Sequence, residues 1–245
     1  MFACGCDPKQ GDSTNTNEIP STEIIRLLAN GESLIIKGKT ITGLLNFTMA
    51  DEAVWGTTYI SSEICFIDCT FKDEVTAFVS KPGFSRCVFE RNIVFNDCRF
   101  EKKVDFNNAV FRLEVNFDGS QFMENANFAN AVFFMGLSFR KSFFKKDCIF
   151  HFARFNNITK FIESHFYGYT DYSQIFSGSI LDFTASKFHG ETLMSYSMLL
   201  GDVIFSNCNF IQQMEFKENA VLGEINFKSV EGLIPDITNN KMFNR

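Results

Sequence analysis

The chain has 245 residues, a formal net charge of −6 and a pI near 5.2. This acidic balance argues against non-specific nucleic-acid binding through a basic face. Phenylalanine is unusually frequent, with 32 Phe against five Tyr and one Trp, and the spacing of these residues is the strongest signal in the sequence.

The first 20 residues are polar and predict either a disordered leader or a lipoprotein-like tether. Ala3-Cys4-Gly5-Cys6 resembles the end of a bacterial lipoprotein signal, which makes Cys6 and Cys4 the candidate lipidation residues. That interpretation requires an apolar stretch upstream of Met1 and implies the cell envelope. The alternative is a cytoplasmic leader. No apolar stretch is long enough for a transmembrane helix.

Residues 21–40 are expected to cap one end of the fold. Residues 21–31 predict a short amphipathic helix with Ser21 or Thr22 as its N-cap, and Gly31 ends it. Its apolar face would contain Ile24, Ile25, Leu27 and Leu28. The stretch that follows reads as the first strand. A cap of this kind covers the apolar rings and unpaired strand edges that an open solenoid end exposes.

From about residue 41 to residue 231, apolar residues recur alternately five and six positions apart. In the first part of this region the spacing is held by Leu44, Met49, Trp55, Ile60, Phe66 and Phe71. Seven extra residues then interrupt the register near residues 72–83. We interpret them as a protruding loop, and because loops on rigid scaffolds often carry binding residues, this loop is a candidate contact site.

A regular phenylalanine ladder follows, made of two series that each repeat every 11 residues. The first series is Phe84, Phe95, Phe106, Phe117, Phe128, Phe139, Phe150 and Phe161, and the second is Phe89, Phe100, Phe111, Phe122, Phe133, Phe144, Phe155 and Phe166. The ladder then becomes irregular, because Tyr172 holds a Phe position, Ile175 a small-residue position and Ser177 the next rung. These changes predict a bulge or kink. Residues 232–245 are expected to form a C-terminal cover or tail.

The five/six alternation favours coiled extended chain over helix. On a helix, at roughly 100° per residue, successive rungs would scatter around the cylinder, and the intervening Asn, Asp, Ser, Thr and Gly are poor helix formers. In extended chain, residues two apart share a face. Each Phe and the small or medium residue two before it therefore point inward together, and polar residues turn the corners.

The stretch FNDCRFEKKVDFNNAVFRLEVNFDGSQF, residues 95–122, closely resembles the pentapeptide-repeat family in its five/six-spaced Phe variant. The resemblance covers about residues 41–231. It implies an all-β fold, a right-handed four-sided β-helix with 22 residues per coil and about eight coils. It says almost nothing about function.

Chemical motifs are lacking. Cys69, Cys87, Cys98 and Cys208 hold the small inward position and Cys148 the other inward position, so we interpret them as small buried hydrophobes. No C-x-x-C pair, P-loop, G-x-S-x-G or H-E-x-x-H occurs. The sequence therefore predicts no enzyme, no metal and no cofactor.

Two other function classes remain open. The resemblance also implies that the protein could be a gyrase-binding DNA mimic, a function that needs a column of carboxylates on the surface. Asp202 and Glu224 align, but Lys or Arg breaks the other columns. The second alternative is a carbohydrate-binding or carbohydrate-active β-helix, which needs clustered carboxylates.

One outer patch stands above this background. With 22 residues per coil, Phe143 stacks under His165 and Tyr167 under His189, and Tyr169 lies near the corner. Clustered exposed aromatics can mark a recognition surface. We therefore expect a non-catalytic, rigid protein-interaction scaffold. The expected partner is another protein, and a second copy of the chain is a further candidate. We expect no direct nucleic-acid binding, and membrane contact only through the lipid anchor.

Overall fold

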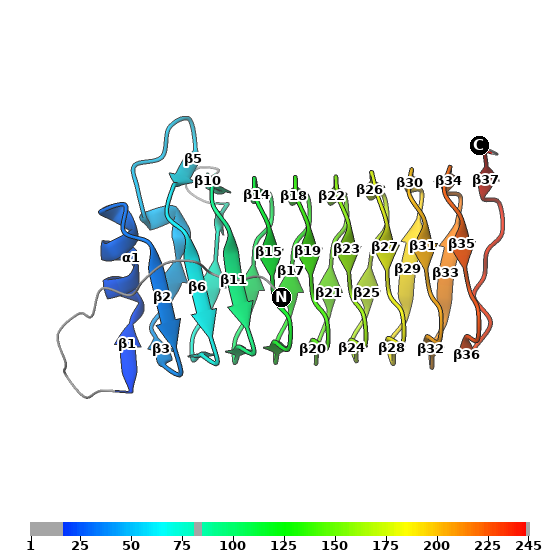
Figure 1. The fold of residues 1–245 in the computed structure, drawn as a ribbon, viewed down its shortest axis with the longest axis horizontal. Helices are drawn as coiled ribbons and strands as arrows, with labels where there is room; N and C mark the ends of the chain where they lie inside the picture. Colours follow the sequence, from blue (N-terminus) through cyan, green and yellow to red (C-terminus); the bar gives the residue numbers. More distant parts are fainter. Residues whose placement is uncertain (1–16, 81–84, 244–245) are drawn as a thin grey trace.

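The computed structural model describes residues 17–80 and 85–243. They form an elongated, four-sided β-helix whose coils stack from one short helix towards the C-terminus (Figure 1). Each side of the helix is a parallel sheet. The sheets have ten, nine, nine and eight strands in their main order, with β9 added at the side of the second, so the solenoid has about ten turns rather than the eight predicted. The all-β, four-sided fold is confirmed.

Two of the sheets, A and D, contain the Phe residues of the second series. Sheet A contains β1 (Glu18–Pro20), β3 (Thr40–Thr42), β7 (Thr70–Phe71), β12 (Arg99–Phe100), β16 (Gln121–Phe122), β20 (Phe143–Phe144), β24 (His165–Phe166), β28 (Lys187–Phe188), β32 (Asn209–Phe210) and β36 (Glu231–Gly232). Sheet D contains β5 (Thr57–Ile60), β10 (Ser85–Phe89), β14 (Val110–Phe111), β18 (Val132–Phe133), β22 (Arg154–Phe155), β26 (Phe176–Ser177), β30 (Met198–Leu199), β34 (Ala220–Val221) and β37 (Lys241–Met242), with β9 (Phe78–Val79) antiparallel to β10.

The other two sheets alternate with these around the coil. Sheet B contains β2 (Leu34–Lys37), β6 (Ile64–Ile67), β11 (Ile93–Asn96), β15 (Val115–Asn116), β19 (Leu137–Ser138), β23 (Thr159–Lys160), β27 (Leu181–Asp182), β31 (Val203–Ile204) and β35 (Ile225–Asn226). Sheet C contains β4 (Leu45–Asn46), β8 (Val75–Thr76), β13 (Val104–Asp105), β17 (Ala126–Asn127), β21 (Cys148–Ile149), β25 (Thr170–Asp171), β29 (Thr192–Ser195) and β33 (Met214–Lys217).

The N-terminal end is covered by α1 (Ser21–Ala29), whose Ile24 and Leu28 are buried in the core. The helix follows β1, a strand formed by residues that the sequence analysis placed in the polar leader. The N-cap is Pro20, with no side-chain cap bond, rather than Ser21 or Thr22. Pro20 has a φ of −68° and an extended ψ of 139°, and the fixed φ of proline is compatible with that conformation directly before a helix.

Phenylalanine rings from successive coils stack face to face in columns. In sheet A, Phe122 stacks on Phe100 and Phe144 with centroid distances of 4.9 and 4.7 Å. Rings of neighbouring columns meet edge to face, as Phe117 and Phe128 do at 5.7 Å. The ladder residues from Phe89 to Phe166 are all buried, and Phe84 lies outside the described residues. Offset and edge contacts are the arrangements that aromatic rings prefer.

The small inward residues contribute hydrogen bonds as well as space. The hydroxyl of Ser142 donates to the Phe117 carbonyl at 2.9 Å, and that of Ser164 donates to the Phe139 carbonyl at 2.5 Å. Ser164 Oγ also accepts from the Ser142 N–H at 3.2 Å. Buried backbone groups at this corner are thereby satisfied. The Ser positions on this side of the helix thus differ in role from the Ala positions at the opposite corner.

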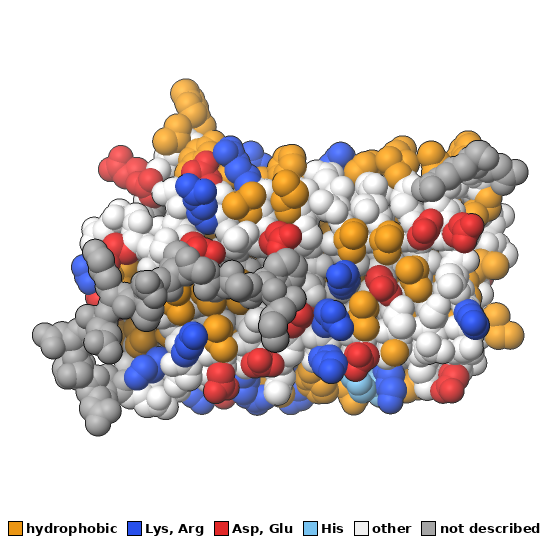
Figure 2. Space-filling model, in the orientation of Figure 1, with side chains coloured by type: hydrophobic (Ala, Val, Ile, Leu, Met, Phe, Trp, Pro, Cys, Tyr) orange, Lys and Arg blue, Asp and Glu red, His pale blue; other side chains and the backbone are white. Residues whose placement is uncertain are grey.

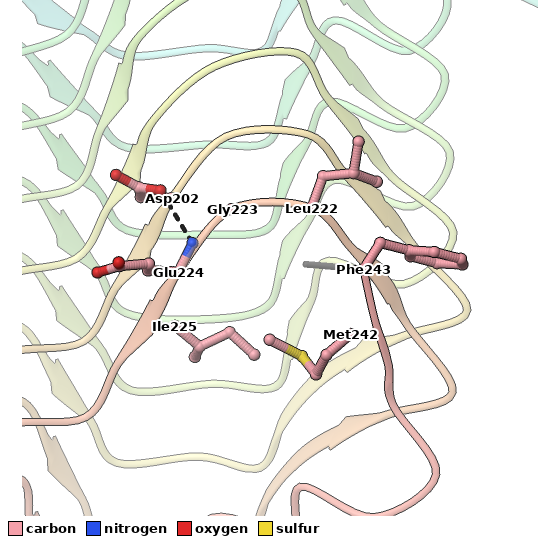
Figure 3. Close-up of a pocket in the computed structure, with 7 residues that line it drawn as sticks. All are labelled: Asp202, Leu222, Gly223, Glu224, Ile225, Met242 and Phe243. Atoms are coloured by element: carbon pink, nitrogen blue, oxygen red, sulfur yellow. Dashed lines mark hydrogen bonds between the residues drawn. The ribbon is translucent and has the colours of Figure 1, made fainter. Parts of the chain in front are cut away.

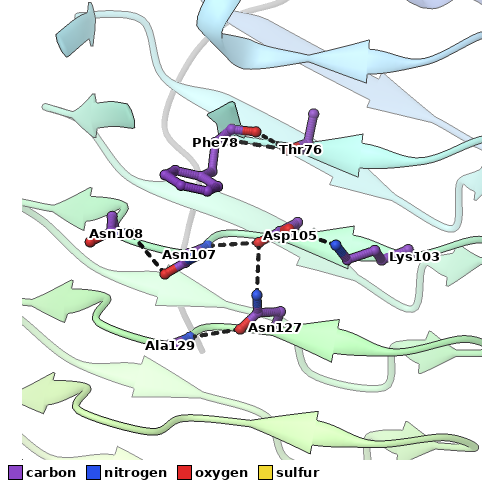
Figure 4. Close-up of polar contacts among 8 residues, drawn as sticks. All are labelled: Thr76, Phe78, Lys103, Asp105, Asn107, Asn108, Asn127 and Ala129. Atoms are coloured by element: carbon purple, nitrogen blue, oxygen red, sulfur yellow. Dashed lines mark hydrogen bonds and ion pairs between the residues drawn. The ribbon is translucent and has the colours of Figure 1, made fainter. Parts of the chain in front are cut away.

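Two of the four corners of each coil, those that follow the first Phe series, are tight turns in which one residue has a positive φ. Asn108 lies in a turn closed by the Ala109 N–H donating to the Phe106 carbonyl at 3.0 Å. Figure 4 shows the polar contacts at such corners, where Asp105 Oδ1 accepts from the Asn107 N–H and from Asn127 Nδ2, both at 3.1 Å. Asn and Asp favour these turns because their short side chains bond the nearby backbone.

The structure corrects the predicted register of the first coils. Leu44, Met49 and Trp55 are exposed, and Trp55 is 98% exposed, so none of them is a rung. The inward positions belong to Leu45 and Phe47. An insertion therefore lies between Phe47 and Ile60, and sequence spacing hid it.

The second insertion also starts later than predicted. Val75 and Thr76 are in register with Val104 and Asp105, so residues 72–77 belong to the coil. The inward position that corresponds to Phe106 therefore belongs to Ala77, which comes before the insertion. The sequence analysis had assigned this position to Phe84. The extra residues begin with β9. Both insertions leave the helix at the same corner, between sheets C and D, and Figure 1 shows the first one protruding before β5.

The predicted kink near Tyr172 is wrong. Arg154 pairs with Phe176 and Phe155 with Ser177, so the register continues without a bulge. Tyr172 is buried and stacks on Phe150 at 5.1 Å. In this coil Ile175 occupies a position that usually holds a small residue, and Ser177 occupies a position that usually holds a Phe ring. The two changes compensate in volume and keep the interior filled.

Candidate interaction surfaces

Four side chains on the outer face of sheet A form one cluster, which we call the ring–histidine patch: Phe143, His165, Tyr167 and His189. The Tyr167 ring lies between Phe143, at 5.0 Å, and His189, at 4.0 Å and nearly parallel. His165 lies 6.4 Å from Tyr167 and 6.2 Å from His189. Rings from three successive strands thus make a continuous outer surface.

Sheet register places these four residues in two adjacent columns. Phe143 pairs with His165, and His165 pairs with Lys187. The Tyr167 N–H donates to the Phe144 carbonyl at 2.8 Å, and the His189 N–H donates to the Phe166 carbonyl at 2.7 Å. The inward neighbours Phe144, Phe166 and Phe188 stack at 4.9 and 4.8 Å. The patch is therefore supported from below by the core and held at strand spacing.

Both patch histidines favour the neutral form. Burial, then the charges of Lys187 and His189, lowers the pKa of His165 below its ordinary value of 6.5. Burial and Lys187 lower the pKa of His189 in the same way. Nε2 of His189 is covered and has no hydrogen-bond partner among the described residues, so nothing there stabilises an added proton.

Lysines border the rings. Lys145 and Lys146 follow β20, and Lys187 lies in β28 beside His165. All three are exposed, and none forms an ion pair within residues 17–80 and 85–243. Figure 2 shows a histidine with basic side chains beside it along the rim that carries β24 and β28 in Figure 1. The patch is cationic on a chain of net negative charge.

The fifth residue predicted for this patch, Tyr169, lies around the corner. Its backbone N–H donates to Asp147 Oδ1 at 3.0 Å. Burial, together with Asp171, raises the pKa of Tyr169 to about 12. Its surroundings are the carboxylates of sheet C rather than the rings of sheet A, because the chain turns at Gly168 between Tyr167 and Tyr169.

Two glycines keep that corner narrow. A Cβ added to Gly190 would lie 2.1 Å from the Gly168 carbonyl oxygen, and one added to Gly168 would lie 2.4 Å from the backbone of Lys146. Only glycine allows backbones to approach this closely. The corner at these two glycines therefore separates Tyr167 and His189, on the side of sheet A, from the strands of sheet C.

The inserted hairpin is a second exposed feature. Val54 and Thr57 exchange backbone hydrogen bonds of 2.9 and 3.0 Å around Trp55 and Gly56, which both have positive φ. This geometry is a two-residue hairpin turn in which Asn and Gly are preferred. Trp55 therefore stands fully exposed at the tip. The loop predicted near residues 72–83 contributes β9 nearby, and residues 81–84 lie outside the described part.

The outer face of sheet D carries exposed apolar residues that the sequence analysis did not single out: Tyr59, Phe134, Met198 and Leu222. Arg154 crosses this face with its guanidinium 4.4 Å from the Phe176 ring centroid. The signal was present in the sequence. These residues stand directly before or after an inward rung, where extended chain points outward.

Sites for other chemistry are not formed by the described residues. No group of three His, Cys, Asp or Glu side chains could hold a metal ion within the described ranges. No helix in that part is long and apolar enough to cross a membrane. The six described cysteines are buried, whereas Cys4 and Cys6 lie outside the described residues.

A shallow hollow near the C-terminal end includes the two aligned carboxylates. The Glu224 N–H donates to Asp202 Oδ1 at 2.9 Å (Figure 3). The hollow is lined by Asp202, Leu222, Gly223, Glu224, Ile225, Met242 and Phe243. One pair of carboxylates beside apolar side chains is not an acidic stripe of the kind that DNA mimicry requires.

Comparisons with known proteins agree with this architecture. A family model described as pentapeptide repeats (9 copies) matches residues 84–132. No curated protein and no solved structure matches the chain. The matched segment lies within the longer run of coils in the same 22-residue register. Residues 84–132 thus match the pentapeptide-repeat family, and the described residues have the fold of a four-sided β-helix.

Proposed function

We propose that this protein is a non-catalytic scaffold that binds a partner protein through the ring–histidine patch. The observation that supports the proposal is the exposed Tyr167 ring between the half-buried rings of Phe143 and His189, on a sheet whose backbone is bonded on both sides. Tyr is among the residues that most often dominate binding energy at interfaces. A flat, preorganised ring surface also loses little conformational entropy on binding.

Site-specific photocrosslinking in cells tests this proposal. A benzophenone-bearing phenylalanine analogue is placed at Tyr167, and at Lys160 on sheet B as the matched control. We expect one discrete crosslinked protein from position 167 and none from position 160. Phe143→Ala and His189→Ala should reduce that product at least severalfold without changing the circular dichroism spectrum. Equal crosslinking at both positions, or a product unaffected by these substitutions, would refute the assignment.

A further inference from the structure

The ring–histidine patch combines three features that describe its ligand. Phe143 and Tyr167 offer ring faces and edges at 5.0 Å from one another. Burial and Lys187 lower the pKa of His165 and His189, so the two rings add flat surface and disfavour a further positive charge. Exposed lysine ammonium groups border the rings at both ends. A ligand that complements all three features needs negative charge and at least one flat apolar group.

The carboxylates nearest the patch are occupied or face elsewhere. Glu163 lies 3.7 Å from Lys141, and Asp147 accepts from the Tyr169 backbone. Glu191 follows the Gly190 corner towards sheet C. Since these groups leave Lys145 and Lys187 without an ion pair in the described part, the positive charge of the lysines is available to a ligand.

The spacing of the charges suits an extended peptide. Lys145 and Tyr167 stand in one column, and Lys187 stands in the other, two strands beyond Lys145. At about 4.8 Å per strand, roughly 10 Å separates the strands that carry the two lysines. An extended peptide rises about 3.3 Å per residue and its alternate side chains share a face, so carboxylates four residues apart span about 13 Å on one face. The two lysines stand in different columns as well as on different strands, so this span suits them, with an aromatic side chain midway between the carboxylates over Tyr167.

We propose that the ring–histidine patch, together with Lys145, Lys146 and Lys187, is the docking site for an acidic, aromatic-containing peptide segment of the partner. This inference rests on the proposed function and specifies the partner's chemistry. A protein segment fits better than nucleic acid, because the chain as a whole is negatively charged and would repel a long polyanion. The lysines are too few to offset that repulsion over an extended strand.

Histidine NMR gives a direct test, because the chain contains only three His residues. His151, which bonds Ser173 at 2.7 Å on another face, is the internal control. The probes are the short peptide Glu-Ser-Phe-Ser-Glu, which places both glutamates and the phenylalanine on one face when extended, its glutamine counterpart and a single-stranded oligothymidylate. We expect the glutamate peptide to shift the His165 and His189 resonances, to leave His151 unchanged, and to raise the pKa of both patch histidines.

Charge variants separate this inference from the scaffold function. Lys145→Gln and Lys187→Gln should each weaken glutamate-peptide binding about twofold to fivefold, whereas Lys160→Gln on sheet B should not. Added salt should weaken binding as well. Equal binding of the glutamine peptide, tighter binding of the oligonucleotide, or no shift at His165 and His189 would overturn the acidic-segment inference. Crosslinking from position 167 would still judge the scaffold function independently.

Discussion

Removal of one ring from the centre of the solenoid tests how the fold is stabilised. The Phe128 side chain is fully buried, stacks on Phe106 and Phe150 at 5.7 and 4.9 Å, and meets Phe139 edge to face at 5.4 Å. Truncation of a fully buried Phe to Ala costs about 3–5 kcal/mol, because a cavity remains where the ring was. The coils here cannot collapse into that cavity, since ladder hydrogen bonds hold each one at strand spacing.

We therefore expect Phe128→Ala to lower the free energy of unfolding by about 4–5 kcal/mol, at the upper end of that range. The matched control is Phe134→Ala on the outer face of sheet D, where the ring is 49% exposed and the cost should be about 1 kcal/mol or less. Urea unfolding followed by circular dichroism measures both. Similar losses for the two variants would show that stacked rings are not the main source of stability.

Three further predictions concern corners, the hairpin and the histidines. Ala185 has a φ of +60°, so Ala185→Gly should raise the melting temperature through a net gain of about 0.5 kcal/mol. Gly119→Ala should lower it, because Gly119 has a φ of +71° and the added Cβ would also displace the Asp97 side chain. Trp55→Asn should leave the melting temperature unchanged or slightly higher, and a clear decrease would contradict the exposed-hairpin assignment. Because the unfolded histidines protonate first, near pH 6.5, stability should fall as pH drops through that value, and it should fall less in the His165→Asn/His189→Asn variant in pH-dependent urea titrations.

Sequence spacing predicted the part of the fold in which every coil has the same length. Between Phe89 and Phe166 each inward ring recurs after 22 residues, so residues that contact one another across coils follow from counting alone. The same counting placed Phe143 against His165 and Tyr167 against His189. Parallel in-register strands repeat one environment down each column, which makes such predictions reliable.

Counting failed where an insertion carried apolar residues of its own. Met49 and Trp55 fall at the five/six spacing by coincidence, while the coil actually turns inward at Leu45 and Phe47. A spacing rule cannot tell Leu44 from Leu45, because both are apolar and adjacent. The turn of the insertion is Trp55-Gly56, with both residues at positive φ, and of this pair only the glycine is a turn signal in the sequence.

Two other predictions, the kink near Tyr172 and the place of Tyr169 in the patch, failed for reasons unrelated to insertions. Near Tyr172 the side-chain volume lost where Ser177 replaces a ring is made up by Ile175, which replaces a small residue in the same coil. A pattern read along the sequence counts these as two separate departures from the repeat. Tyr169 is two residues from Tyr167, but a corner at Gly168 intervenes and turns the two side chains to different sheets. Proximity in sequence predicts proximity on a surface only along one side of the coil.

The proposed binding surface depends on the same features that stabilise the fold. Each patch side chain adjoins an inward ring: Tyr167 follows Phe166, and His189 follows Phe188, and these two rings stack at 4.8 Å. The separation of the outer rings is thus set by the core stack and by the ladder bonds above and below. A partner meets a surface that is already ordered, so its own ordering accounts for most of the entropic cost of binding. Sequence changes at the outward positions can then alter the partner without altering the fold, because the inward positions alone determine the register.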